Sequence, residues 1–124
     1  MKQVFLVFIG GGFGSVFRYL IGKYLNSESS GIPFGTFLAN VLGSLFIGII
    51  LGLAAKNESL TQSQTLLLAT GFCGGFTTFS TFAYENHEFL KNGDFFHLGL
   101  YTVLSFVVAI LAVFLGMYAS RFFA

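Results

Sequence analysis

Four long apolar stretches, separated by short polar joints, dominate the pattern of hydrophobic and polar positions along the chain. A bilayer core is about 30 Å thick, so a helix needs about 20 apolar residues to cross it. The stretches have that length, and they alternate too poorly for the strands of a membrane β-barrel. The pattern therefore predicts four transmembrane helices, over approximately residues 4–22, 32–55, 64–84 and 95–122.

The joints hold residues that begin or interrupt helices. Ser59 or Thr61 is placed to cap the third predicted helix. Pro33 stands at the start of the second one, where the first helical turn tolerates proline. Because no linker, repeat or low-complexity segment divides the chain, we predict a single domain over residues 1–124.

The composition is typical of a protein solvated by lipid. Hydrophobic residues make up 55% of the chain and charged residues 9%, whereas soluble proteins carry about 25% charged residues. A water-exposed surface with so few charges would aggregate. The net charge of +1 and the scattered basic residues leave no basic stripe, so we expect no nucleic-acid partner. These features predict an all-α integral membrane protein surrounded by lipid.

Basic residues are divided almost evenly between the two ends of the predicted bundle. The end with both termini holds Lys2, Lys56 and Arg121, and the other end holds Lys23 and Lys91, with Arg18 nearby. The rule that cytoplasmic loops are positive therefore gives almost no preferred orientation. Either one charge decides, or the chain inserts both ways. The second alternative would make antiparallel dimers natural, with the same surface used by both copies.

Small residues recur every fourth position on three predicted helices: Gly10 and Gly14; Ser44, Gly48 and Gly52; Ala112, Gly116 and Ser120. Such stripes let membrane helices approach closely, so we expect them to pack the bundle.

Polar side chains inside membrane helices are costly and usually functional. Arg18 follows a glycine-rich run in the first helix. It either extends to the membrane interface, or it is a fixed cation that attracts an anion or ties helix ends together. Asn40 lies deep in the second helix. Its amide can bond another helix or donate to a dehydrated anion in a pore. The residue types leave these alternatives open.

The third predicted helix contains the unusual string ATGFCGGFTTFSTFAYE, in which glycines precede a run of hydroxyl residues. Glycine is a poor helix former, so we expect this helix to be broken, or at least kinked. A break near Gly74 and Thr77 would expose carbonyls that suit a hard monovalent cation. Phe76, Phe79 and Phe82 recur at every third position. Such rings usually pack, but their positive edges can also stabilise an anion.

The fourth predicted helix carries Tyr101, Thr102 and Ser105 among apolar residues. Tyr101 and Ser105 share a helix face. Their hydroxyls form a polar track for an ion or bond carbonyls one turn earlier.

No group of residues indicates an enzyme. His87 and His97 lie near acidic residues without the ligand geometry of a metal site. Cys73, the one cysteine, lies in an apolar run where a thiol stays protonated.

The strings GGGFGSVFRY, GTFLANVLGS and GFCGGFTTFSTF follow one another on successive predicted helices. In this order they resemble the Fluc (CrcB) family of fluoride channels, over essentially the whole chain, and the third string is the most specific. The resemblance implies a passive, fluoride-selective channel that exports fluoride across the bacterial cytoplasmic (inner) membrane and protects against fluoride toxicity. It also implies an antiparallel, dual-topology homodimer with two fluoride pathways.

The resemblance further assigns roles to individual residues. Phe79 and Phe82 would line the pathway with their ring edges toward the ion, and Asn40 would donate to fluoride. Arg18 would organise the entrance, and Glu85 would act near the exit. The polar track would contain Tyr101 and Ser105, with Ser80 or Thr81 as further members. Carbonyls of Gly74 and Thr77 from both subunits would hold one central, structural sodium ion (Na+).

The main alternative is a small dual-topology, proton-coupled exporter of drugs or cations, which also has short helices and balanced charge. Such an exporter needs a membrane-buried carboxylate. All the acidic residues fall in the predicted joints or at helix ends: Glu28, Glu58, Glu85, Glu88 and Asp94. A second alternative, a non-transporting assembly subunit, would need neither Asn40 nor a polar third helix. The sequence therefore favours the channel.

Overall fold

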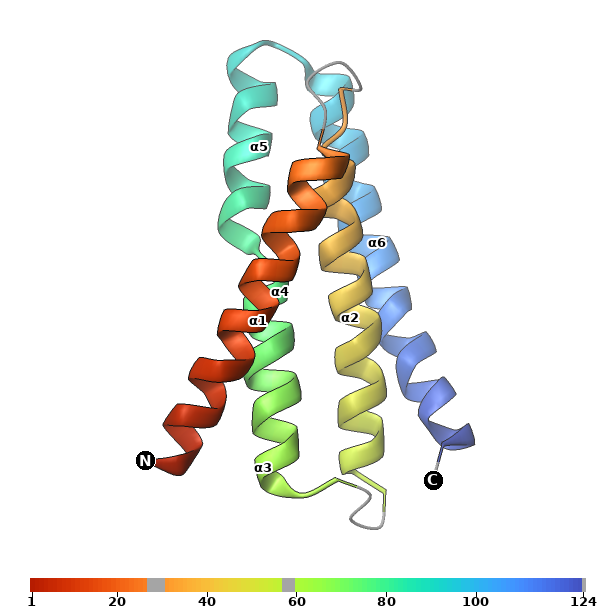
Figure 1. Cartoon of the computed structure of the whole chain (residues 1–124). Helices are drawn as coiled ribbons and strands as arrows, with labels where there is room; N and C mark the ends of the chain where they lie inside the picture. Colours follow the sequence, from red (N-terminus) through yellow and green to blue (C-terminus); the bar gives the residue numbers. More distant parts are fainter. Residues whose placement is uncertain (27–30, 57–59, 124) are drawn as a thin grey trace.

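The computed structural model describes residues 1–26, 31–56 and 60–123. Within these ranges, four helical spans are long and apolar enough to cross a membrane: Lys2–Leu25, Phe34–Ala54, Gln62–Lys91 and Phe95–Phe122. The same ranges contain no β-strand. The prediction of an all-α protein with four membrane-spanning helices is therefore confirmed. Both termini lie at one end of the bundle, and the turn between the third and fourth spans lies at the other (Figure 1).

The first, second and fourth spans are almost entirely α-helical. Helix α1 covers Lys2–Leu25 and α2 covers Phe34–Ala54, with Pro33 immediately before its first residue. Helix α6 covers Phe95–Ala119 and ends in a short 3-10 turn, η2, at Ser120–Phe122. The first span is longer than the predicted 4–22, because the helix continues through polar residues as far as Leu25.

The third span consists of four consecutive elements: α3 (Gln62–Thr65), the π-helical stretch η1 (Leu66–Cys73), α4 (Gly74–Phe76) and α5 (Phe79–Lys91). Thr77 and Thr78, between α4 and α5, have extended backbone conformations. The span begins with a reciprocal cap, in which the Thr61 hydroxyl accepts from the Gln64 N–H and the Gln64 side chain accepts from the Thr61 N–H. Thr61 thus caps this span as predicted, and Ser59 lies outside the described residues.

The third span also extends beyond the predicted end at residue 84, since α5 continues to Lys91. Glu85 and Glu88 therefore lie on a helix and not in a joint. Hydropathy marks where the apolar run ends, whereas the helix ends only where its backbone turns. That turn is at Gly93, whose φ of +72° favours glycine. Beyond it, the Asp94 N–H bonds the Phe89 carbonyl at 2.8 Å.

Glycines make the closest helix contacts. A Cβ atom on Gly10 or Gly14 of α1 would overlap backbone atoms of the third span. A Cβ on Gly48 of α2 would overlap the backbone of α6, and one on Gly116 of α6 would overlap that of α2. The predicted small-residue stripes therefore do pack the bundle, as membrane helices commonly do.

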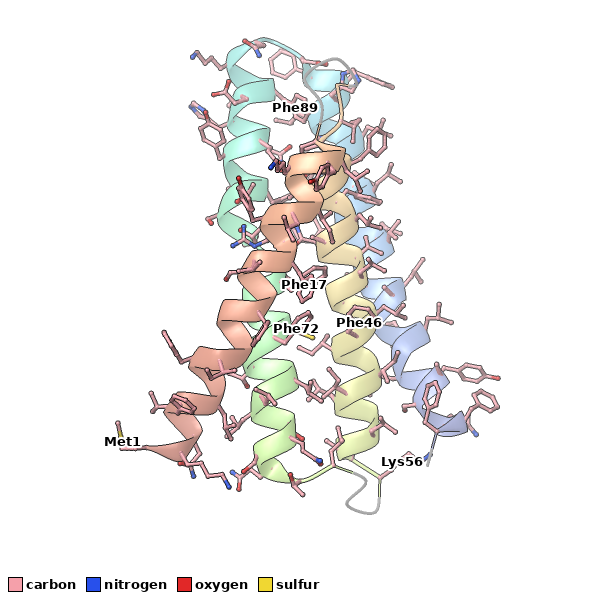
Figure 2. All side chains as sticks on the ribbon, in the orientation of Figure 1. Met1, Phe17, Phe46, Lys56, Phe72 and Phe89 are labelled. Carbon is pink, nitrogen blue, oxygen red and sulfur yellow. The ribbon has the colours of Figure 1, made fainter. Side chains whose placement is uncertain are left out.

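Large apolar side chains project outward from the bundle, as Figure 2 shows. Phe8 and Phe114, for example, are largely exposed. The buried side chains are mostly small, but Tyr101 is large and only 1% exposed. An apolar exterior of this kind suits lipid, and it leaves the polar side chains of the interior as the candidates for function.

Candidate functional site

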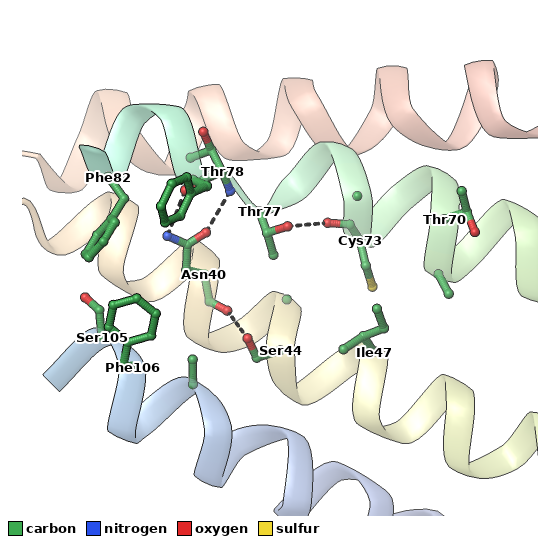
Figure 3. A pocket seen from close by; sticks show the side chains of 15 residues that line it. Asn40, Ser44, Ile47, Thr70, Cys73, Thr77, Thr78, Phe82, Ser105 and Phe106 are labelled. Carbon is green, nitrogen blue, oxygen red and sulfur yellow. Dashed lines mark hydrogen bonds between the residues drawn. The ribbon is translucent and has the colours of Figure 1, made fainter. Parts of the chain in front are cut away.

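The interruption between α4 and α5 is held by the side chain of Asn40 from α2. The Asn40 Oδ1 atom accepts from the Thr78 N–H at 2.7 Å, and its Nδ2 donates to the Thr78 carbonyl at 3.1 Å (Figure 3). The side chain thereby satisfies both backbone groups of a residue outside the helical hydrogen-bond pattern. An amide NH₂ has two N–H groups, so one N–H of Asn40 is left for another acceptor.

The same interruption deprives two carbonyls of their helical partners. In a continuous α-helix the Gly74 carbonyl would accept from the Thr78 N–H, and the Thr77 carbonyl from the Thr81 N–H. The Thr78 N–H instead donates to Asn40. The Thr81 N–H donates to the Thr78 hydroxyl at 3.2 Å. The carbonyls of Gly74 and Thr77 are therefore released from the helical ladder.

Arg18 reaches this region from α1. Its Nε atom donates to the Gly75 carbonyl at 3.1 Å, and the residue is half-buried. The guanidinium thus ties the first span to the third one, immediately before the interruption. A positive charge at this position also stabilises the C-terminal end of α4.

A pocket of about 510 Å³, called here the central pocket, lies beside the interruption. Residues of α2, the third span and α6 line it: Asn40, Gly43, Ser44, Ile47, Ala69, Thr70, Cys73, Gly74, Thr77, Thr78, Phe79, Phe82, Ser105, Phe106 and Ala109. Of the described residues that line it, none carries a charge. The central pocket therefore combines phenylalanine rings with neutral hydroxyl and amide groups.

Ser105 is the most informative residue of the central pocket. Its hydroxyl oxygen is buried, and it has no hydrogen-bond partner among the described residues. Ser105 therefore does not bond a carbonyl one turn earlier, which was the alternative open from the sequence. A buried polar group without a partner costs about 1–3 kcal/mol. Most buried polar groups have a hydrogen-bond partner, so this hydroxyl is a candidate contact for a water or an ion.

Aromatic rings lie beside this hydroxyl (Figure 3). Phe82 is buried and contacts Phe106 edge-on, at 5.8 Å between ring centroids. It also contacts Tyr101 at 5.1 Å. Figure 3 shows Phe82 and Phe106 next to Ser105. Phe79, by contrast, is 72% exposed and projects from the subunit.

Ser80 and Thr81, the further candidates for a polar track, lie at the start of α5. The Thr78 hydroxyl lies 3.3 Å from both the Ser80 and the Thr81 hydroxyl oxygens. Neither Ser80 nor Thr81 is among the residues that line the central pocket.

A second pocket of about 480 Å³, called here the outer pocket, lies toward the other end of α5. It is lined by Asn26, Gly31, Ile32, Pro33, Glu85, Glu88, Phe89 and Asn92. Glu85 connects it to the bundle interior. One carboxylate oxygen accepts from the Tyr101 hydroxyl at 2.6 Å, and the other from the Thr36 hydroxyl at 2.6 Å. Because Ser105 follows Tyr101 by one turn, polar groups extend from the outer pocket to the central pocket.

Sequence reasoning missed Thr36 and Asn26, which support Glu85. Thr36 is buried in the first turn of α2, and Asn26 bonds its hydroxyl from the end of α1. Thr36 belongs to the string GTFLANVLGS, where a hydroxyl residue among apolar ones was the available signal. Asn26 gave no comparable signal, because asparagine in a polar joint is ordinary.

Two other polar residues singled out in the sequence, Asp94 and His97, form a helix cap. Asp94 caps α6 by accepting from the His97 N–H at 3.2 Å, and the His97 ring bonds the same carboxylate at 2.7 Å. Cys73 is buried. The described residues contain no group of three or more His, Cys, Asp or Glu side chains that could hold a metal.

Comparison with known proteins shows a family likeness over nearly the whole chain. The family model described as "CrcB-like protein, Camphor Resistance (CrcB)" matches residues 5–117. A curated relative from Gloeothece citriformis is 48% identical over 98% of each chain. Another, from Azobacteroides pseudotrichonymphae, is 41% identical over 99% of each chain. A third, from Prosthecochloris aestuarii, is 45% identical over 97% of this chain and 94% of its own. All three are named "Fluoride-specific ion channel FluC".

Proposed function

Because the chain belongs to the CrcB-like protein family, we propose that it is a passive, fluoride-selective ion channel. It exports fluoride across the bacterial cytoplasmic membrane and so protects the cell from fluoride toxicity. The observation that carries this function is the buried Ser105 hydroxyl, which has no partner among the described residues and borders a pocket without charged lining. A proton-coupled exporter would need a carboxylate in its transport pocket, and the described lining of the central pocket has none.

Neutral donors suit the passage of fluoride. This ion is small and strongly hydrated, so the channel must replace its water with other donors. A full positive charge would hold the ion too tightly for conduction, whereas hydroxyls, amide N–H groups and positive ring edges bind it weakly enough for release. In the central pocket, the Ser105 hydroxyl, the second N–H of Asn40 and the ring edges of Phe82 and Phe79 supply these contacts.

The outer pocket is the second part of the pathway. Fluoride enters or leaves past Glu85 and Tyr101 and moves one helical turn to Ser105. The Tyr101 hydroxyl has a single proton, which it donates to Glu85 in the resting arrangement. Fluoride at Tyr101 must therefore take this proton contact from the carboxylate. Ser80 and Thr81 extend the polar surface at the start of α5.

The working channel is an antiparallel homodimer with two pathways. Two features support this proposal. The Phe79 ring and the central pocket lie on a face that the single subunit leaves open, and the balance of basic residues permits both orientations. A second copy on this face would also shield the interruption of the third span from lipid. Unpaired backbone is tolerated at membrane depth only against protein or a cavity.

Carbonyls of Gly74 and Thr77 from both subunits of this dimer would hold one structural sodium ion. The residues present fit such an ion, because the carbonyls of Gly74 and Thr77 are released from the helical ladder. Carbonyl oxygens of interrupted helices are ligands of this kind. The cation would offset the negative ends of these carbonyl dipoles near the anion pathway, and Arg18 holds the neighbouring Gly75 carbonyl.

Fluoride efflux from proteoliposomes, followed with a fluoride electrode, tests the site. Ser105→Ala removes the hydroxyl, whereas Ser105→Thr retains it. We expect the wild type to release fluoride, Ser105→Ala to be slower by about tenfold or more, and Ser105→Thr to keep most of the rate, since a hydrogen bond to an ion contributes about 1.5–3 kcal/mol. Fluoride efflux from Ser105→Ala at the wild-type rate would show that fluoride does not contact this hydroxyl.

A further inference from the structure

Asn26, the residue immediately after α1, caps the beginning of α2 across the joint between the two helices. Its Oδ1 atom accepts from the Gly35 N–H at 2.7 Å and from the Thr36 N–H at 3.2 Å. Its Nδ2 atom donates to the Thr36 hydroxyl oxygen at 3.2 Å. The two backbone donors fix the orientation of the amide, because a reversed amide would direct its own N–H groups at them.

This orientation determines which way the Thr36 hydroxyl points. A hydroxyl has one proton and two acceptor positions. Since Asn26 Nδ2 only donates, Thr36 accepts on that side and keeps its proton for Glu85. The Thr36 Oγ1 atom donates to Glu85 Oε2 at 2.6 Å, and Tyr101 donates to Glu85 Oε1 at 2.6 Å. Asn26 therefore donates to Thr36, and Thr36 in turn donates to Glu85.

We propose that Asn26 is a positioning residue for the fluoride pathway, which orients Thr36 so that Glu85 accepts one hydrogen bond at each carboxylate oxygen. This inference rests on the proposed function. With both oxygens held, the carboxylate stays beside Tyr101 at the boundary between the outer pocket and the bundle interior. Without the hydrogen bond from Thr36, the Glu85 carboxylate keeps only the hydrogen bond from Tyr101. It then turns into the outer pocket, which it lines together with Asn26.

Asn26→Asp separates this role from helix capping. Aspartate caps helices as well as asparagine does, so the bonds to Gly35 and Thr36 N–H remain. A carboxylate cannot donate, however, and it would draw the Thr36 proton away from Glu85. We expect unchanged thermal stability in detergent and fluoride efflux that is slower by about fivefold, which corresponds to one ordinary hydrogen bond. Thr36→Val should have a similar effect, and the double variant should be no slower than either single one.

Asn86→Asp is the matched control for the added negative charge. Its Oδ1 atom accepts from the Thr102 hydroxyl at 3.2 Å, and an aspartate oxygen can do the same. This variant adds the same charge next to Glu85 in sequence, without reversing a hydrogen bond. We expect it to release fluoride at the wild-type rate.

An infrared measurement gives a readout independent of transport. The Glu85 carboxylate stretching band, assigned by difference from Glu85→Gln, should shift in Asn26→Asp and in Thr36→Val but stay in place in Asn86→Asp. Three results would each overturn the proposal. The first is fluoride efflux from Asn26→Asp at the wild-type rate. The second is a double variant whose loss of rate is the product of the two single losses, and the third is a loss of rate in Asn86→Asp equal to that in Asn26→Asp. If the wild type carried no fluoride, the proposed function would fail, and the infrared band would still test the positioning of Glu85.

Discussion

The Asn40 side chain bonds both backbone groups of Thr78, accepting from its N–H at 2.7 Å and donating to its carbonyl at 3.1 Å. One side chain of α2 thus supplies the partner that the Thr78 N–H loses where α4 ends, and it bonds the Thr78 carbonyl as well. Of the two roles open from the sequence, the Asn40 amide therefore has the first, a bond to another helix. Its second N–H is left for an ion. Asn40 therefore has two connected tasks in the proposed channel: it fixes the shape of the interruption and it contributes a donor.

Asn40→Asp should abolish fluoride efflux and destabilise the protein. A carboxylate can still accept from the Thr78 N–H, but its second oxygen would face the Thr78 carbonyl, and the spare donor is lost. We expect a loss of about 1–3 kcal/mol in unfolding free energy, measured by thermal unfolding in detergent. Asn86→Asp serves as the matched control, because an aspartate oxygen can still accept from the Thr102 hydroxyl and the residue does not line the central pocket. Equal stability of Asn40→Asp and wild type would contradict the account.

Phe79→Ile should slow fluoride efflux by about tenfold or more, since it removes a positive ring edge, while leaving the fold of the subunit intact. The Phe79 side chain is 72% exposed and contributes little to the packing of a single subunit. Phe114 is 67% exposed on α6 and does not line the central pocket. Phe114→Ile is therefore the matched control and should conduct as the wild type does. Similar rates for both variants would show that the Phe79 ring has no role in conduction.

Gly48→Ala and Gly116→Ala should each lower thermal stability, because the added methyl group would overlap backbone atoms of the facing helix. Overpacking of this kind costs about 1–3 kcal/mol. Gly12→Ala is the matched control, since a Cβ at Gly12 meets nothing within 4 Å. Unfolding curves in detergent should show a lower midpoint for the first two variants only. A stable Gly48→Ala variant would mean that α2 and α6 are not held as closely as described.

Labelling from both sides of the membrane tests the proposed dual topology. Tyr24 is 75% exposed near the end of α1, and Tyr24→Cys changes no charge. The native Cys73 is 1% exposed, so the wild type serves as the unlabelled control. An impermeant maleimide should reach about half of the introduced thiols from outside sealed vesicles, as an antiparallel pair requires. The other half should react only after permeabilisation. Labelling of all thiols, or of none, from outside would indicate a single orientation.

The sequence predicted the spans well, because crossing a membrane requires about 20 apolar residues and this requirement is visible in hydropathy. It did not predict where the third span ends. The residues from Glu85 to Lys91 are mostly polar, yet they continue as one helix to the turn at Gly93. As a result, Glu85 was expected after the helix and lies instead on α5, bonded to Thr36 and Tyr101.

The candidate site was predictable where a residue type is itself unusual for a membrane helix. Asn40, Arg18 and Ser105 are polar in apolar surroundings, and this singled them out. Asn26 could not be identified in this way. Its importance comes from the geometry of the joint, which brings the end of α1 against the start of α2. Contacts across a joint of this kind depend on tertiary structure, which residue type and periodicity do not encode.

The central claim is that a dehydrated fluoride ion crosses the central pocket along neutral donors and ring edges, with no charged side chain in the lining that the structure describes. Paired measurement of fluoride and chloride efflux from the same proteoliposomes, with valinomycin and a potassium gradient as the driving force, tests it most directly. We predict rapid release of fluoride while chloride stays trapped, because hydroxyl, amide N–H and ring-edge donors compensate fluoride for its lost water. Release of chloride as fast as fluoride, or no release of either ion, would contradict it.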